Sequence, residues 1–151
     1  MQYLVFEYAD KNLLELLEEY PDGLRSPWVR AYAFQLIQAL HWCHTSNVMH
    51  RDIKPENLLI ESQPSEAGTL KLCDFGFART MAMANESITD YVSTRWYRAP
   101  ELLLGYTHYG PSVDIWAIGC ILGVRTYALF MRCSDVHEHW CGSCNFTFSR
   151  A

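Results

Sequence analysis

The chain has 151 residues, 50% of them hydrophobic, so it is long enough to form one domain with an apolar core. Its formal net charge is −5, and the charges are scattered without a basic stripe, which argues against nucleic acid or an anionic membrane as a partner. No apolar run approaches the roughly 20 residues that span a bilayer, and no basic segment precedes an apolar one at the N-terminus. We therefore expect a soluble protein of the cytoplasm, the nucleus or both.

Six cysteines are present, and their positions argue against a disulfide framework. Cys43, Cys73 and Cys120 lie inside apolar stretches, where a reduced cysteine usually packs as a small hydrophobe. The other three, Cys133, Cys141 and Cys144, fall near the C-terminus.

The first 45 residues predict a strand and two helices. Strand-favouring residues fill 3–6, and leucines at 13, 14, 16 and 17 recur at helical spacing before a turn at 21–23. Ser26 is predicted to cap a long buried helix with Pro27 at its first position. One face of this helix is apolar: Val29, Ala33, Leu36, Ile37, Leu40 and Cys43.

Two short strands, 58–60 and 70–73, are expected next, joined by a polar loop over 61–69. Such a hairpin would bring the residues just outside its strands to one place. A third helix is predicted from about 112 through 121. Its apolar residues surround it almost completely, so we expect it in the middle of the core.

The strongest functional signal is the run His50-Arg-Asp-Ile-Lys-Pro-Glu-Asn57, followed seventeen residues later by Asp74-Phe-Gly76. Seven specified residues at fixed spacing arise by chance at roughly one in a billion positions on uniform usage. Taken singly, each charged residue would more often be a solvated loop residue, so their joint order carries the prediction.

These residue types suit phosphoryl transfer, which needs metal ions on a triphosphate and a carboxylate that orients the attacking hydroxyl. Asn57 and Asp74 offer hard oxygen ligands for Mg²⁺. Asp52 then remains free to accept or orient the substrate proton, and Lys54 can stabilise the transferring phosphoryl group.

With these two motifs the sequence resembles eukaryotic protein kinases. Ala99-Pro-Glu101 follows at the expected place, and Thr89-Asp-Tyr91 before Thr94-Arg-Trp-Tyr-Arg98 is similar to the activation loop of mitogen-activated and cyclin-dependent kinase relatives. The segments 34–44 and 71–79 most resemble the cyclin-dependent kinase-like subfamily of this group.

The resemblance implies an α+β, mainly α fold: a protein kinase-like hinge and partial C-lobe, with the N-lobe absent. It implies a serine/threonine kinase that transfers the γ-phosphoryl group of ATP with Mg²⁺. Protein substrates, with a preference for proline after the target hydroxyl, and an upstream kinase are the implied partners.

The resemblance also implies further site residues. Thr94 would lie beside the catalytic carboxylate and help to define Ser/Thr specificity. Phosphate on Thr89 would pair with Arg51 and Arg79, and phosphate on Tyr91 with Arg95 and Arg98. The alternative is that Thr89 and Tyr91 are ordinary exposed loop residues.

At the N-terminal end, residues 6–9 resemble the hinge between kinase lobes. Phe6 would guard the back of the adenine pocket, the backbones of Glu7 and Ala9 would bind adenine, and Leu59 would form the pocket floor. Lys54, Asn57 and Asp74 complete the nucleotide site. For an isolated strand, Phe6 would simply be a core residue. Asp114 resembles the aspartate that anchors the catalytic-loop backbone.

The ends of the chain depart from the family. None of the eight glycines forms Gly-x-Gly-x-x-Gly, and the strand lysine and helix glutamate of the small lobe have no counterpart, so we expect this chain alone to bind nucleotide poorly and catalyse little or nothing. We predict a partial kinase domain over 1–123 and an unrelated tail over 124–151. Read-through into non-coding sequence, or an incorrect gene prediction, is the preferred origin of that tail.

The tail permits one further interpretation. Cys141-Gly-Ser-Cys144, with Cys133, His137 and His139, has residue types of a zinc site, but the usual second Cys pair is missing, so we do not expect zinc. Two functions stay open for the chain: a kinase whose sequence is truncated here, and a non-catalytic lobe that acts as a docking or decoy module.

Overall fold

The computed structural model describes residues 3, 5–63, 66–81 and 95–127, with only the backbone at 63 and 124–127. Its helices are α1 (Leu13–Glu19), α2 (Ser26–Thr45), α3 (Pro100–Leu103) and α4 (Ser112–Tyr127), with short 3-10 turns at Pro55–Asn57 and Phe75–Phe77. Its strands are β1 (Lys11–Asn12), β2 (Val48–Met49), β3 (Leu58–Gln63), β4 (Glu66–Leu72) and β5 (Arg79–Thr80). The fold is therefore α+β with helices predominating, as predicted.

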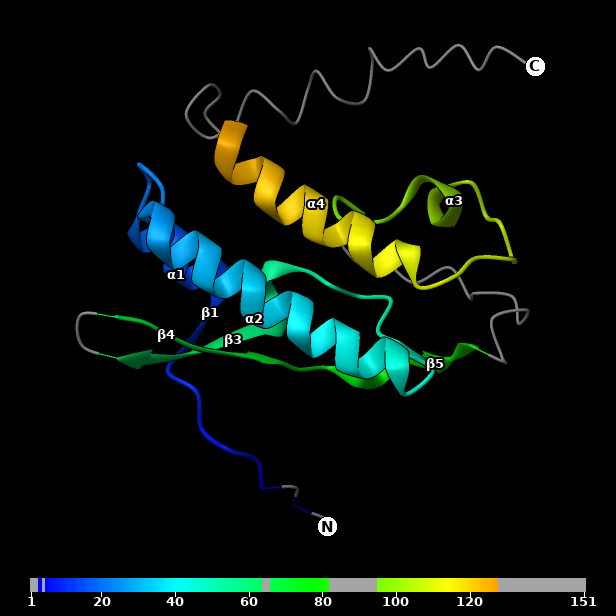
Figure 1. The fold of residues 1–151 in the computed structure, drawn as a ribbon, viewed down its shortest axis with the longest axis horizontal. Helices are drawn as coiled ribbons and strands as arrows, with labels where there is room; N and C mark the ends of the chain where they lie inside the picture. The colour runs from blue at the N-terminus through cyan, green and yellow to red at the C-terminus, as the bar shows by residue number, and fades with distance from the viewer. Residues whose placement is uncertain (1–2, 4, 64–65, 82–94, 128–151) are drawn as a thin grey trace.

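Helix α2 runs along the β3–β4 hairpin, and α4 lies beyond α2 on the side away from the sheet (Figure 1). The larger sheet has the order β1-β3-β4 and is antiparallel throughout, with Leu58 opposite Leu72 and Ile60 opposite Leu70. The second sheet pairs β2 with β5. The pairing of β2 with β5 and a contact between His50 and Cys73 place the loop that follows β2 near the loop that follows β4.

The core is one apolar cluster between the helices and the hairpin. Its buried members come from every large element: Leu13, Leu16, Leu24, Tyr32, Leu36, Leu40, Ile53, Leu58, Ile60, Leu70, Ala117, Ile118 and Ile121. Burial of this apolar surface is the main favourable term in folding. No helix in the described ranges is long and apolar enough to cross a membrane.

The predicted helix at the leucine-rich segment is confirmed as α1, and its start has a clear cause. The Asn12 side chain accepts from Glu15 N–H at 2.9 Å, and the Glu15 carboxylate accepts from Asn12 N–H at 2.8 Å. This capping box satisfies two backbone donors that a helix end leaves without partners.

The predicted cap of α2 is wrong by one residue. Trp28 and Val29 both donate to the carbonyl of Arg25, so Arg25 is the cap and Ser26 already belongs to the helix. The predicted inner face is buried at Leu36, Leu40 and Cys43 but not at Ile37, which is 50% exposed.

The predicted strand over 3–6 is wrong. The described residues of this segment adopt no regular structure, and Tyr3, Val5 and Phe6 are largely exposed. A strand needs a neighbour for its backbone hydrogen bonds, and the segment that does pair with β3 is β1, at Lys11–Asn12.

The predicted hairpin is confirmed, but its strands are longer than expected. They extend to Gln63 and from Glu66, so most of the predicted loop over 61–69 is paired strand. Gly68 permits this pairing because its φ is +76° and a Cβ there would collide with the carbonyl of Glu61.

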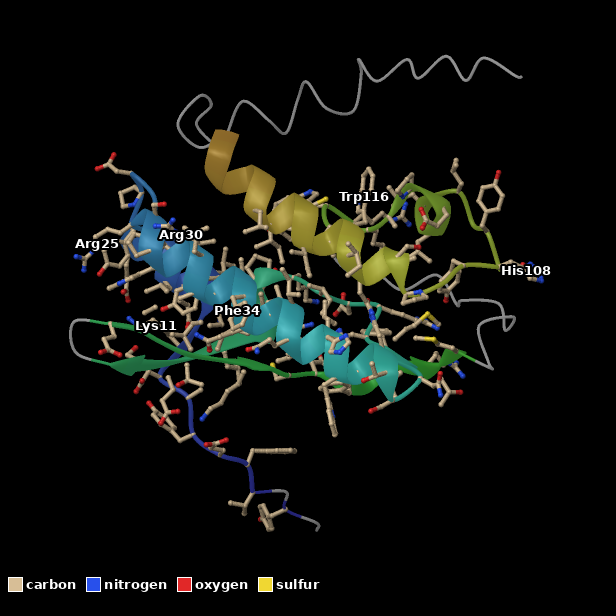
Figure 2. The ribbon with its side chains drawn as sticks, viewed as in Figure 1. Lys11, Arg25, Arg30, Phe34, His108 and Trp116 are labelled. Carbon is tan, nitrogen blue, oxygen red and sulfur yellow. The ribbon has the colours of Figure 1, made fainter. Side chains whose placement is uncertain are left out.

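The third predicted helix forms as α4, but it is not surrounded by core. Val113, Ala117, Ile118 and Ile121 are buried, whereas Ile115 and Trp116 are about half exposed. Trp116 lies on the side of α4 away from α2 in Figure 2. Periodicity could not separate these faces because apolar residues occupy both.

Candidate active site

Asp114, in the first turn of α4, holds the loop that follows β2. Its Oδ1 accepts from Arg51 N–H at 2.7 Å, and its Oδ2 accepts from His50 N–H at 2.9 Å and lies 2.8 Å from His44 Nε2. The carboxylate is 1% exposed, so these N–H groups replace water as its partners. Because Arg51 has a φ of +71°, which a residue with a Cβ rarely adopts, Asp114 fixes an otherwise unfavourable backbone.

His50 connects this loop to the loop after β4. Its Nε2 lies 2.9 Å from the carbonyl of Cys73, and Asp52 N–H lies 3.3 Å from its Nδ1. A carbonyl only accepts, so Nε2 carries the proton and Nδ1 is the acceptor. The ring also meets Phe75 edge-on at 4.9 Å. Although His50 opens the recognised motif, its bridging role was not predicted, because the partner is a backbone carbonyl that no sequence pattern reveals.

Asp52, Lys54 and Asn57 form one cluster, as their spacing suggested. Lys54 Nζ lies 2.8 Å from Asp52 Oδ2, and Asn57 Nδ2 donates to the same oxygen at 3.0 Å and to the Asp52 carbonyl at 2.8 Å. Asp52 is 8% exposed. A carboxylate held by a cation and an amide is fixed in orientation, which suits it to accept a proton from a nearby hydroxyl.

Asp74 is brought beside Asn57 by the backbone. Cys73 N–H donates to the carbonyl of Asn57 at 3.0 Å, so Asp74 follows directly after the paired residue. Its φ of +60° turns the chain sharply, and its carboxylate accepts from Gly76 N–H at 3.2 Å while remaining exposed.

The donor set of Asn57 and Asp74 fits Mg²⁺. Asn57 uses its amide nitrogen toward Asp52, which leaves its side-chain oxygen for a cation, and the exposed Asp74 carboxylate is accessible. Mg²⁺ characteristically takes one or two protein oxygens and completes its shell with water and phosphate. Within the described part of the chain no group of three or more His, Cys, Asp or Glu residues could form a metal site.

A small hollow of about 10 Å³, room for about one water molecule, lies against the catalytic cluster. Its lining includes Asp52 and Lys54, Tyr97 and Arg98 ahead of α3, and Leu102 within α3. The catalytic cluster thus lies beside the segment that leads into α3.

The residues predicted to contact adenine are exposed or half-buried in the structure. Phe6 is 81% exposed, and Ala9 and Leu59 are half-buried, with Leu59 paired to Asn12 and Lys71 in the sheet. The Glu7 side chain forms an ion pair with Lys71 at 2.7 Å. Hydrogen bonds to Glu61 and then to Glu7 raise the pKa of Lys71 above its usual value.

The predicted phosphate-pairing arginines occupy different surroundings. Pairing of Met49 with Arg79 places Arg79 close to Arg51, whose guanidinium lies 5.9 Å from the ring centre of Tyr109. Arg98 lines the hollow, and Arg95 is exposed. Several predicted residues lie outside the described ranges: Thr89, Tyr91, Thr94, Cys133, His137, His139, Cys141 and Cys144.

Comparisons with known proteins agree with this geometry. A family model described as Protein kinase domain matches residues 1–137. Over 122 residues the chain is 61% identical to Cyclin-dependent kinase-like 5 of Homo sapiens and of Mus musculus, an alignment that covers 80% of this chain and 12% of each relative. Over 120 residues it is 56% identical to Cyclin-dependent kinase-like 2 of Homo sapiens, covering 80% of this chain and 24% of that protein.

The chain thus spans about an eighth to a quarter of the length of these relatives. The family match runs past residue 123, where we predicted the kinase-like part to end, and the boundary between 1–123 and 124–151 stays a prediction. Because the match extends over most of its length, the chain belongs to the protein kinase domain family.

Proposed function

We propose that this chain is part of a serine/threonine protein kinase, which transfers the γ-phosphoryl group of ATP to a protein hydroxyl. One observation carries the proposal. The Asp52 carboxylate is held between Lys54 and Asn57, in a loop fixed by the buried Asp114. The likeness to kinases of the cyclin-dependent kinase-like group supports Ser/Thr as the acceptor.

In this mechanism Asp52 orients the substrate hydroxyl and accepts its proton as the oxygen attacks the γ-phosphorus. The bond from that phosphorus to the bridging oxygen breaks, and ADP leaves. Lys54, 2.8 Å from Asp52, lies where it can stabilise the transferring group. Asn57 and Asp74 would hold Mg²⁺, which when bound neutralises charge on the phosphates.

Membership of the protein kinase domain family supports a protein as the substrate. Proline after the target hydroxyl remains a proposal from the resemblance. The phosphorylation switch at Thr89 and Tyr91 is likewise a proposal from the resemblance.

A second candidate function is a non-catalytic docking or decoy lobe. The observation that favours it is the exposed Phe6, because this residue was expected to line the adenine site. A lobe without an adenine pocket could still bind a protein.

A chimeric kinase distinguishes the two proposed functions. In a chimera, the 122 aligned residues replace their counterpart in human Cyclin-dependent kinase-like 5, and phosphorylation of a protein substrate is measured with Mg²⁺-ATP. The kinase function predicts phosphorylation that Asp52→Asn removes and Asp22→Asn, at an exposed turn, leaves unchanged. An inactive but folded chimera would instead favour the docking function, and a pull-down of substrate by the 151-residue chain would then test it.

A further inference from the structure

The side-chain amide of Gln35, on α2, bonds the edge of β4 that faces away from β3. Its Oε1 accepts from Leu70 N–H at 2.7 Å, and its Nε2 donates to the carbonyl of Gly68 at 3.2 Å. A backbone N–H only donates and a carbonyl only accepts, so these two partners fix which end of the amide is the oxygen. Within the described ranges no strand pairs with this edge of β4. Gln35 therefore supplies the partners that a further strand would otherwise supply.

The two bonds resemble those of a parallel strand. Gly68 and Leu70 flank Thr69, and a residue opposite Thr69 in a parallel ladder would likewise bond the residues before and after it. The hydroxyl of Tyr32, one turn earlier on α2, donates to the carbonyl of Ala67. Helix α2 thus fastens β4 through backbone groups over residues 67–70, where such groups need partners.

Apolar packing alone does not determine how far β4 extends along β3. Apolar residues alternate at 58 and 60 on β3 and at 70 and 72 on β4, so a shift by two residues would again pair apolar side chains. Gly68 excludes this shift, because a residue with a Cβ in its place would collide with the carbonyl of Glu61. The Gln35 amide holds the carbonyl of this same glycine. The register that Gly68 selects is therefore the one that Gln35 fastens.

The position of β4 matters because its end leads to Asp74. Cys73 N–H donates to the carbonyl of Asn57 at 3.0 Å, and the Cys73 carbonyl lies 2.9 Å from His50 Nε2. A shift of β4 along β3 would carry Asp74 past Asn57. Groups that bind one ion have to be held within about 0.5 Å of their working geometry, so even a looser attachment of β4 would affect the pair.

We propose that Gln35 is a positioning residue, whose amide fastens β4 to α2 and thereby holds Asp74 beside Asn57. It acts through the extended backbone between Leu70 and Cys73. This inference deepens the proposed phosphoryl transfer, and it rests on that function only for its effect on Mg²⁺.

Amide hydrogen exchange in the 151-residue chain tests the positioning without nucleotide or metal. Gln35→Leu nearly keeps the size of the side chain and removes both hydrogen bonds, and Gln38→Leu, at an exposed position of the same helix, is the matched control. In Gln35→Leu the N–H of Leu70 should exchange about tenfold faster, the effect of one hydrogen bond. The N–H of Cys73 should also exchange faster, whereas that of Ile118, in α4, should exchange as in the wild type. The control should match the wild type at all three.

These amides distinguish positioning from a general loss of stability. A purely structural role would accelerate exchange at Ile118 as much as at Cys73, and a purely local role would accelerate it at Leu70 alone. Either result would overturn the proposal. Gln35→Glu is the second variant: its carboxylate can still accept from Leu70 N–H but cannot donate to Gly68, so the Cys73 rate should lie between those of the wild type and Gln35→Leu. If Gln35→Leu does not fold, an unchanged Cys73 rate in Gln35→Glu overturns the proposal.

The chimera described above measures the consequence for Mg²⁺. There Gln35→Leu should raise the Mg²⁺ concentration for half-maximal phosphorylation about tenfold, an effect typical of residues that orient metal ligands. The rate at saturating Mg²⁺ should change less. An unchanged Mg²⁺ requirement in an active chimera would overturn the proposal. A chimera that is inactive with Gln35 intact would contradict phosphoryl transfer instead, and the exchange rate of Cys73 would then decide the positioning role by itself.

Discussion

The backbone N–H of Arg51 donates to Oδ1 of Asp114 at 2.7 Å, across 63 residues of sequence. This contact joins the catalytic loop to the first turn of α4, and the second carboxylate oxygen accepts from the neighbouring His50. The buried Asp114 carboxylate therefore helps to position the loop, in addition to the contacts within the loop itself. Stability and site geometry should depend on the same side chain.

Asp114→Asn should lower the free energy of unfolding by about 3 kcal/mol, because one backbone donor would face an amide N–H inside the protein. Denaturation by urea measures the change, with Asp22→Asn at an exposed turn as the control. Equal stability of the two variants would show that the buried carboxylate does not hold the loop.

Gly68→Ala should destabilise the hairpin more than Gly105→Ala. Both glycines have positive φ, +76° and +74°, but only at Gly68 would a Cβ meet backbone, at the carbonyl of Glu61. At Gly105 the left-handed backbone should lower the free energy of unfolding by about 1 kcal/mol. At Gly68 the decrease should be larger by at least about 1 kcal/mol, because of the added collision. Thermal unfolding compares them, and equal losses would exclude the steric effect.

Tyr32→Phe should lower the free energy of unfolding by about 1 kcal/mol, because the Tyr32 hydroxyl donates to the carbonyl of Ala67 and joins α2 to β4. Tyr8→Phe removes a hydroxyl from an exposed ring and should have no effect. Chemical denaturation of both variants tests this link, which is absent if they unfold alike.

The stability of the fold should decrease as the pH rises past 9.0, the usual pKa of a thiol. Burial first, and then the charge of Asp114, raise the pKa of Cys43, so the folded chain keeps this proton at a pH where the unfolded chain has lost it. The unfolded state then binds fewer protons, and stability falls with pH.

Unfolding free energies measured from about pH 8 to about pH 10 follow this effect, in a range where an exposed thiol titrates. Cys43→Ala should show a shallower decline than the wild type. It should not abolish the decline, because burial also raises the pKa values of Cys73 and Cys120. An identical slope in the variant would contradict the assignment to Cys43.

Local sequence patterns predicted those helices and strands whose formation depends on residues close in sequence. The leucines of α1 and the two strands of the hairpin were found because their periodicity and their turn residues agree. The strand predicted at 3–6 failed because strand formation depends on a neighbouring strand, which composition does not reveal. The exposed side of α4 was missed because Ile115 and Trp116 are as apolar as its buried residues.

The site residues that lie close together in sequence could likewise be predicted from local patterns. Asp52, Lys54 and Asn57 lie within six residues, so their clustering followed from spacing, and Asp114 was found through resemblance. The bridging role of His50 was missed because its partner is the backbone carbonyl of Cys73, which only coordinates show.

The most direct test of the central claim is the initial rate of label transfer from γ-labelled ATP to a protein substrate by the chimera described above. With Asp52 intact, we predict label on serine or threonine, and with Asp52→Asn a rate lower by about 100-fold to 10,000-fold, the contribution typical of a positioned acid–base group. Label transfer that proceeds equally well with Asp52→Asn would contradict the account.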